Sequence, residues 1–174
     1  DITANYPPYT GKQNETIRGG GDLSVPVGTK LTWLFDAKNA DEVAVYFADK
    51  KYIATKQNDE KFSFTKICMD GGSYQVKVSN HSSNTVDSVA YNLSVSPDLY
   101  PVINVSEKRD SLNDRYFYYI GDVSDDYGVK RLTFNYNITH EDGNITSTKA
   151  TIEVPFSAGV ASRFTYFWNL KDLG

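Results

Sequence analysis

Short runs in which apolar and polar residues alternate recur along this 174-residue chain, and they limit its possible folds more than any other feature. Within one run, residues at every second position share one parity, meaning that they fall on the same face of a strand. Within residues 30–36 and 42–47, the apolar residues of one parity are Leu31, Trp33, Phe35, Val43, Val45 and Phe47. Within residues 73–80 and 88–96, they are Tyr74, Val76, Val78, Val89, Tyr91, Leu93 and Val95. A period of two is typical of strands with one buried face. Four such strands need a second sheet to cover them, so we predict an antiparallel two-sheet β-sandwich.

The stretch between these runs, residues 47–67, is mostly polar. We interpret it as an edge hairpin that ends in a strand around Phe62 and Phe64. No window has convincing helical periodicity. Aromatic residues make up 14% of the chain and there is one methionine, a composition that favours strands over helices.

A domain boundary is predicted at residues 96–101, where two prolines bracket a short polar stretch. Beyond it, five further runs are candidate strands: residues 102–106, 115–123, 130–139, 149–156 and 163–170. An Asp-Gly pair at residues 142–143 is a hairpin signal between two of them.

We therefore predict an all-β chain with two tandem β-sandwich domains, residues 1–97 and 98–174. Such a sandwich uses roughly 100 residues, so the second domain is expected to be incomplete at its C-terminus. An incomplete sheet leaves an open edge that can pair with another chain.

One motif in the first domain indicates the kind of sandwich. Residues 70–80, DGGSYQVKVSN, resemble the sixth-strand signature of immunoglobulin-like domains, with Asp70, Gly72 and Tyr74 at matching positions. Val76 stands where the family has an inward cysteine, so apolar packing alone would hold the two sheets together. The resemblance implies that Tyr74 is a corner tyrosine whose hydroxyl bonds to nearby backbone.

The densest group of reactive side chains in the second half surrounds Asp125 and Asp126. Calcium sites need several converging oxygen ligands, and the acidic pattern here is sparser than in known calcium motifs. A turn explains the same residues, because aspartates cap turns with their side chains and Gly128 can adopt a positive φ. We therefore predict that Asp125, Asp126 and Gly128 form a structural turn between two strands, with no metal.

The sequence carries no recognisable catalytic motif. His81 and His140 fall in predicted polar loops, and the thiol of Cys68 has only Lys66 as a basic neighbour. Residues 18–22, RGGGD, lack the Lys-Ser/Thr ending of a phosphate loop. We expect neither enzymatic activity nor a cofactor. With a net charge of −4 and no basic excess in either half, we also expect no nucleic-acid binding.

Binding through aromatic side chains is the remaining prediction. Alternation puts Tyr116 and Tyr118 on one face of a strand and Phe117 and Tyr119 on the other. Residues 163–170 add more aromatics, including Trp168. One set can form the core, while the other must be covered by neighbouring chain or by a partner. The candidate contact residues are Tyr116, Tyr118, Tyr119 and Trp168.

Four segments together resemble a known family. These are residues 6–41, which include a Tyr-Thr-Gly opening, 93–105 with a Pro-Asp-x-Tyr-Pro linker, 119–136 with an Asp-Asp-Tyr-Gly turn, and 164–174. In this order they are similar to the region after the N-terminal membrane helices in large Bacteroidetes envelope proteins of unknown function (domain of unknown function 4175 type).

The resemblance implies tandem immunoglobulin-like domains in the periplasm, or on the outer face of the envelope, within a membrane-anchored protein. Contact with the membrane would be made only by segments outside this chain, and the family brings no catalytic residues. The expected function is a non-catalytic spacer or protein-interaction module, whose partner is another envelope protein or a second copy of the chain. Carbohydrate binding, which also uses aromatic faces, is the alternative.

Overall fold

The computed structural model describes residues 1–80, 85–138 and 148–173, which form strands and two short 3₁₀ turns. The chain divides into two compact units, Asp1–Asp98 and Leu99–Gly174, called here the first and second units. No helix among these residues is long and apolar enough to cross a bilayer.

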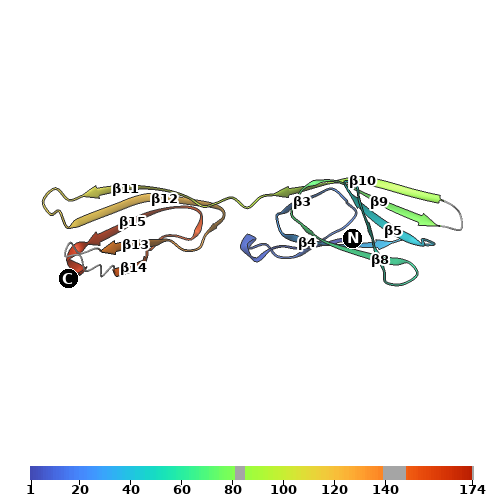
Figure 1. The fold of residues 1–174 in the computed structure, drawn as a ribbon, viewed down its shortest axis with the longest axis horizontal. Helices are drawn as coiled ribbons and strands as arrows, with labels where there is room; N and C mark the ends of the chain where they lie inside the picture. Colours follow the sequence, from blue (N-terminus) through green and yellow to red (C-terminus); the bar gives the residue numbers. More distant parts are fainter. Residues whose placement is uncertain (81–84, 139–147, 174) are drawn as a thin grey trace. The chain divides into compact units, whose positions relative to one another are not determined.

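The first unit is a sandwich of two five-stranded sheets (Figure 1). One sheet has the order β2-β1-β4-β8-β7 and consists of β1 (Ile2–Asn5), β2 (Glu15–Ile17), β4 (Thr29–Asp36), β7 (Thr55–Lys56) and β8 (Lys61–Cys68). The other has the order β3-β10-β9-β5-β6 and consists of β3 (Leu23–Pro26), β5 (Glu42–Phe47), β6 (Lys50–Ile53), β9 (Gly72–Asn80) and β10 (Thr85–Ser96). All pairs are antiparallel except β3 with β10, which is parallel.

The prediction of an all-β, immunoglobulin-like sandwich is confirmed, and alternation identified most of its inner faces. Leu31, Trp33, Val43 and Val45 are buried between the two sheets, as their shared parity predicted. The core there consists of aromatic rings packed around Trp33, whose centroid lies 5.4 Å from that of Phe64 and 6.0 Å from that of Phe47.

Tyr74 joins this core to the chain that precedes β3. Its ring lies edge-on to Trp33, its hydroxyl accepts a hydrogen bond from Trp33 Nε1 at 3.2 Å, and the same hydroxyl donates to the carbonyl of Gly21. The hydroxyl bonds to a backbone carbonyl as predicted, but Gly21 lies 53 residues away in sequence rather than close to Tyr74. The hydroxyl ties two distant segments together across the sandwich.

The polar stretch that we interpreted as one edge hairpin contributes to both sheets instead. β6 pairs with β5 in one sheet, and β7 pairs with β8 in the other. Ala54, which lies between β6 and β7, is buried and its amide donates to the carbonyl of Val43 at 2.8 Å. The chain therefore crosses from one layer to the other at this alanine.

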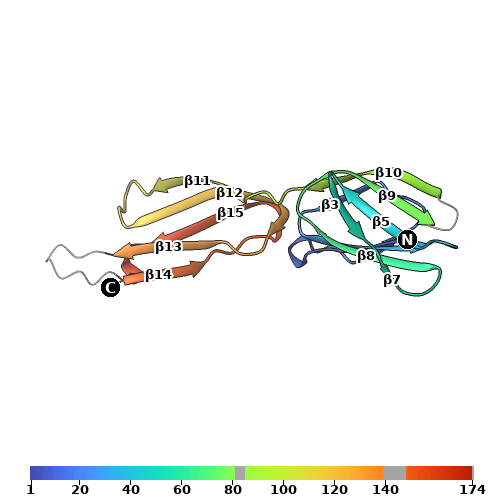
Figure 2. The same ribbon diagram turned by 45° about the vertical axis from the view of Figure 1, so that its right-hand side comes forward.

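The second unit has a three-stranded and a two-stranded sheet (Figure 2). The first has the order β11-β12-β15, with β11 (Val102–Arg109), β12 (Tyr116–Val129) and β15 (Gly159–Asn169), and the second pairs β13 (Thr133–Ile138) with β14 (Thr148–Glu153). Val123, Leu132, Val154 and Phe164 are buried between the sheets. The Asp-Gly pair at residues 142–143 lies outside the described residues.

Asp125, Asp126 and Gly128 lie inside β12 rather than after it. The strand runs on to Val129, and its register against β15 shifts between Ser124 and Val129. The prediction that a strand ends before this stretch is therefore wrong. The chemistry expected of a turn is present nonetheless: Asp125 Oδ2 accepts from the amide of Tyr127 at 3.2 Å, and Gly128 has a φ of 92°. These residues produce an irregularity in a continuous strand.

Candidate functional site

The outer surface of the three-stranded sheet in the second unit carries a cluster of aromatic side chains. Tyr116 and Tyr118 project from β12, and Phe167 lies opposite Tyr118 on β15. The ring centroid of Phe167 is 5.0 Å from that of Tyr118 and 5.5 Å from that of Tyr116. Phe167 is 47% exposed and the two tyrosines are partly exposed. We call Tyr116, Tyr118 and Phe167 the outer aromatic face.

Tyr119 and Trp168 lie on the opposite surface of the same sheet, among the rings that face β13. Phe134 of β13 lies 5.1 Å from Tyr119 and 5.0 Å from Trp168, measured between ring centroids. Desolvation raises the pKa of the Tyr119 phenol, and the carboxylate of Glu107 raises it further. The structure therefore divides the four candidate contact residues: Tyr116 and Tyr118 point outward, while Tyr119 and Trp168 contribute to packing between the sheets.

Phe167 was not among the candidate contact residues, although the alternation in residues 163–170 contains the signal. Phe164, Tyr166 and Trp168 share one parity and Phe167 has the other, so burial of the first set places Phe167 outside. The buried Phe164 confirms which parity faces inward.

Polar side chains continue the outer surface beyond the aromatic face. Asp122 shares the outward parity of Tyr118, and its Oδ1 accepts a 3.1 Å bond from Arg163 Nε across the strand pair. Asn104 of β11 lies opposite Asp122 on the other side. Tyr118 and Asp122 are four positions apart along the strand, which corresponds to about 13 Å. One strand face therefore has aromatic rings at one end and an ion pair at the other.

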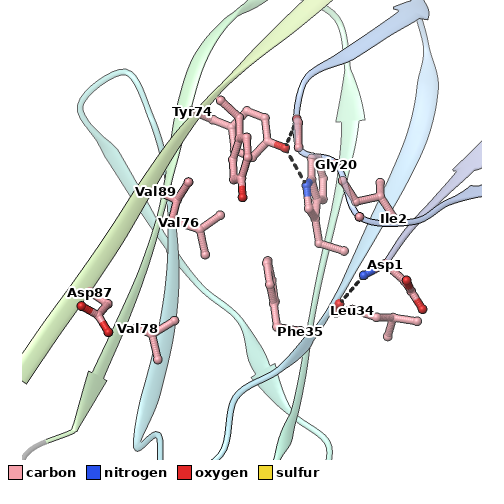
Figure 3. Close-up of a pocket in the computed structure, with 14 residues that line it drawn as sticks. Asp1, Ile2, Gly20, Leu34, Phe35, Tyr74, Val76, Val78, Asp87 and Val89 are labelled. Atoms are coloured by element: carbon pink, nitrogen blue, oxygen red, sulfur yellow. Dashed lines mark hydrogen bonds between the residues drawn. The ribbon is translucent and has the colours of Figure 1, made fainter.

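The first unit has a cavity of about 400 Å³ between its two sheets (Figure 3). Val76 and Val78 of β9 and Val89 of β10 line one wall, and Phe35 of β4 lines the other. In Figure 3, Val76, Val89 and Phe35 point toward the same space, with Asp87 and Asp1 on opposite sides of it. Apolar side chains that alternation predicted to be core thus border an open space.

The candidate groups for chemistry are dispersed. Cys68 is buried in the first unit, where desolvation raises the pKa of its thiol to about 11 and thereby disfavours the thiolate. Asp125 and Asp126 belong to the irregular part of β12. Among the described residues, no three His, Cys, Asp or Glu side chains gather as metal ligands would. His81 and His140 lie outside the described residues.

Comparison with known proteins identifies no family. No family model matches the sequence, and no curated protein matches it. Among solved structures, a chicken TCR is similar with a TM-score of 0.36 at 10% identity, over 87% of this chain and 89% of that one. A DUF3823 family protein from Bacteroides ovatus is similar with a TM-score of 0.21 at 11% identity, over 79% of this chain and 92% of that one.

Proposed function

We propose that the chain is a non-catalytic, extracytoplasmic interaction module of a larger membrane-anchored protein, and that the outer aromatic face makes the contact. The supporting observation is the cluster of Tyr116, Tyr118 and Phe167 on the outer surface of the sheet, where Phe167 is 47% exposed and the two tyrosines are partly exposed. Rigid aromatic side chains supply large contact areas at low entropic cost, and tyrosine is enriched where partners bind most tightly.

The three rings are preorganised for such a contact. The ring of Phe167 lies edge-on to that of Tyr116 and tilted against that of Tyr118, and the pairing of β12 with β15 holds the three rings in place before any partner arrives. Lys108 of β11 lies opposite Tyr118 and adds a charged border. An apolar centre with a polar rim is the usual anatomy of a protein interface.

The compartment proposed is the periplasm or the outer face of a bacterial envelope. Support comes from the sequence motifs that resemble Bacteroidetes envelope proteins, namely the Tyr-Thr-Gly, Pro-Asp-x-Tyr-Pro and Asp-Asp-Tyr-Gly segments in order. The partner is another envelope protein or a second copy of this chain.

The test is an affinity pull-down from a detergent-solubilised Bacteroidetes envelope, with the 174-residue chain as bait. A specific partner should be retained by the parent chain and lost when both Tyr118→Ala and Phe167→Ala are introduced. The matched control is Tyr100→Ala, which removes a tyrosine that is 92% exposed and lies before β11 in the second unit, outside the outer aromatic face. With purified partner, the double variant should bind at least about tenfold more weakly.

Retention of the partner by the double variant would contradict the proposed surface. If nothing is retained beyond what an unrelated sandwich domain retains, the chain is a spacer instead. Sedimentation of the bait alone separates self-association from contact with a different protein, because only self-association raises the mean mass with bait concentration.

Carbohydrate binding is the second candidate, and the polar end of the same strand face favours it. Sugar rings stack on aromatic faces, while carboxylate and guanidinium groups bond to hydroxyls. Tyr118 and the Asp122–Arg163 pair, about 13 Å apart, suit a short oligosaccharide laid along β12. On a glycan array, this candidate requires a bound glycan that is lost in both Tyr118→Ala and Asp122→Asn variants. An array without specific binding would refute it.

A further inference from the structure

The opposite sheet buries the inner surface of the β3-β10-β9-β5-β6 sheet near β5 but leaves it partly exposed toward β10. One row across this sheet contains Val45, Val76 and Val89, which are paired in register from β5 through β9 to β10. Val45 is fully buried, Val76 is partly buried and Val89 is 53% exposed. The uncovered end of the row borders the cavity of about 400 Å³, so apolar surface is left facing open space.

The same part of β10 has an unpaired backbone edge. β3 pairs only with Leu93–Ser96, so residues 86–90 have β9 on one side and no described strand on the other. Two bonds show which groups point outward: the amide of Asn92 donates to Asp22 Oδ1, and the carbonyl of Ser96 accepts from Val27. Because backbone direction alternates along a strand, the amides and carbonyls of Val86, Ser88 and Ala90 also point to the open edge.

A carboxylate stands at this edge beside the apolar surface. Asp87 and Val89 both face the cavity, two residues apart on β10. Across the opening lies Asp1, whose ammonium group donates to the carbonyl of Leu34 at 3.0 Å. The carboxylates of Asp1 and Asp87 are the charged side chains of the described cavity lining, which includes no lysine, arginine or histidine.

We propose that the open edge of β10 binds an extended peptide segment of a partner, which adds a strand beside residues 86–90. The segment carries an apolar side chain beside Val89 and a lysine or arginine beside Asp87, two residues apart. Backbone groups of Val86, Ser88 and Ala90 supply the ladder, and the cavity receives the apolar side chain. This site goes beyond the proposed function, because it lies in the first unit and does not use the outer aromatic face.

The basic residue follows from charge complementarity, and the extended form follows from the backbone edge. A side chain on the added strand lies about 5 Å from its cross-strand neighbour, close enough for a lysine to meet Asp87. Strand addition draws its affinity from main-chain hydrogen bonds and its specificity from alternate side chains, which here are the positions beside Asp87 and Val89.

The test uses two fluorescein-labelled heptapeptides and the full chain, with binding measured by fluorescence anisotropy. The first peptide is Thr-Thr-Lys-Thr-Val-Thr-Thr, which has lysine and valine two residues apart, and the second replaces the lysine with glutamate. We expect saturable binding of the first peptide, and we expect the second peptide to bind about two- to fivefold more weakly. Inverting the charge at this position with Asp87→Lys should reverse the order of the two affinities, so that the glutamate peptide binds more tightly than the lysine peptide.

The decisive variant is Ser88→Pro. Proline removes an outward amide that no described group uses, and edge strands tolerate proline where the amide faces solvent. The variant should therefore unfold at nearly the parent urea concentration but no longer bind the first peptide. Ser88→Ala, which keeps the amide, is the matched control and should bind as the parent does.

Three outcomes would overturn the proposal: no saturable binding of either peptide, equal binding of both peptides by the parent chain, or full binding by Ser88→Pro. Sedimentation of the chain alone tests a different occupant. Self-association that Ser88→Pro abolishes would assign the edge to a second copy of the chain rather than to a partner peptide. Loss of the outer aromatic face through Tyr118→Ala and Phe167→Ala should leave peptide binding unchanged, which separates this site from the proposed function.

Discussion

Replacing Tyr74 with phenylalanine should destabilise the first unit by much more than an ordinary tyrosine-to-phenylalanine change. The ring packing against Trp33 remains, but two hydrogen bonds are lost, one from Trp33 Nε1 and one to the carbonyl of Gly21. Trp33 is 2% exposed and Gly21 is buried, so neither group gains full hydration in exchange.

The magnitude follows from the cost of leaving buried polar groups without a partner. Each such group costs about 1–3 kcal/mol, and partial relaxation of the chain around Gly21 lowers the sum. We expect Tyr74→Phe to reduce the free energy of unfolding of the first unit by about 2–4 kcal/mol. This is a large share of the 5–15 kcal/mol that stabilises a typical domain.

The assay is urea unfolding followed by tryptophan fluorescence. The chain has two tryptophans, Trp33 and Trp168, one in each unit, so a Trp168→Phe background makes the signal report the first unit alone. The matched control is Tyr46→Phe on β5, whose ring lies under Lys77 Nζ and whose hydroxyl makes no described hydrogen bond. A Tyr74→Phe effect no larger than that of Tyr46→Phe would refute the reasoning.

Three further predictions concern single positions. Gly121→Ala should destabilise the second unit by about 2 kcal/mol or more, because the added Cβ would lie 2.2 Å from the carbonyl oxygen of Asn104. Urea unfolding followed by Trp168 fluorescence in a Trp33→Phe background measures this loss, and parent-like stability would contradict it. Gly128→Ala should cost about 1 kcal/mol in the same assay, since its φ of 92° strains other residues, and no loss would mean that the strand irregularity relaxes. Cys68 should resist a thiol reagent at pH 8 until urea unfolds the chain, because its pKa is about 11. The folded pKa exceeds the unfolded value, so the stability from this group is complete below about pH 9 and is lost as pH rises toward 11; a Cys68→Ala variant should lack that loss.

Alternation predicted the central strands of the first unit because their side chains face a core on one side only. β4 and β5 show this well, since Leu31, Trp33, Val43 and Val45 are buried as their parity required. The same reasoning failed at Val89, which has the inward parity but is half exposed. Parity determines on which face of the sheet a side chain lies, whereas the burial of that side chain depends on where the opposite sheet ends.

The N-terminal strands could not be predicted from local pattern. β1, β2 and β3 have only three or four residues each, and prolines and glycines separate them. β1 and β3 also pair with strands farther along the chain, β4 and β10, which a local pattern does not contain. A pattern that spans four residues carries too little periodicity to distinguish a strand from an extended loop.

The candidate contact residues were found from alternation along two strands, but only the structure shows which of them are outside. The sequence predicted correctly that Tyr116 and Tyr118 oppose Tyr119 across β12, but it could not identify which side faces β13. That choice depends on Phe134, which packs against Tyr119, Tyr166 and Trp168. Tertiary contact, rather than propensity, decides which aromatic set stays exposed.

The parallel pairing of β3 with β10 also determines how the first unit would respond to mechanical tension. The paired residues run from Leu23 with Leu93 to Pro26 with Ser96. This ladder joins β3, near the start of the first unit, to β10, its last strand. A force applied between the segment just before β3 and the segment just after β10 pulls the two paired strands in opposite directions, so the ladder is loaded in shear. Its hydrogen bonds must then break together rather than one after another, and the segments on either side are held at a fixed separation until they do.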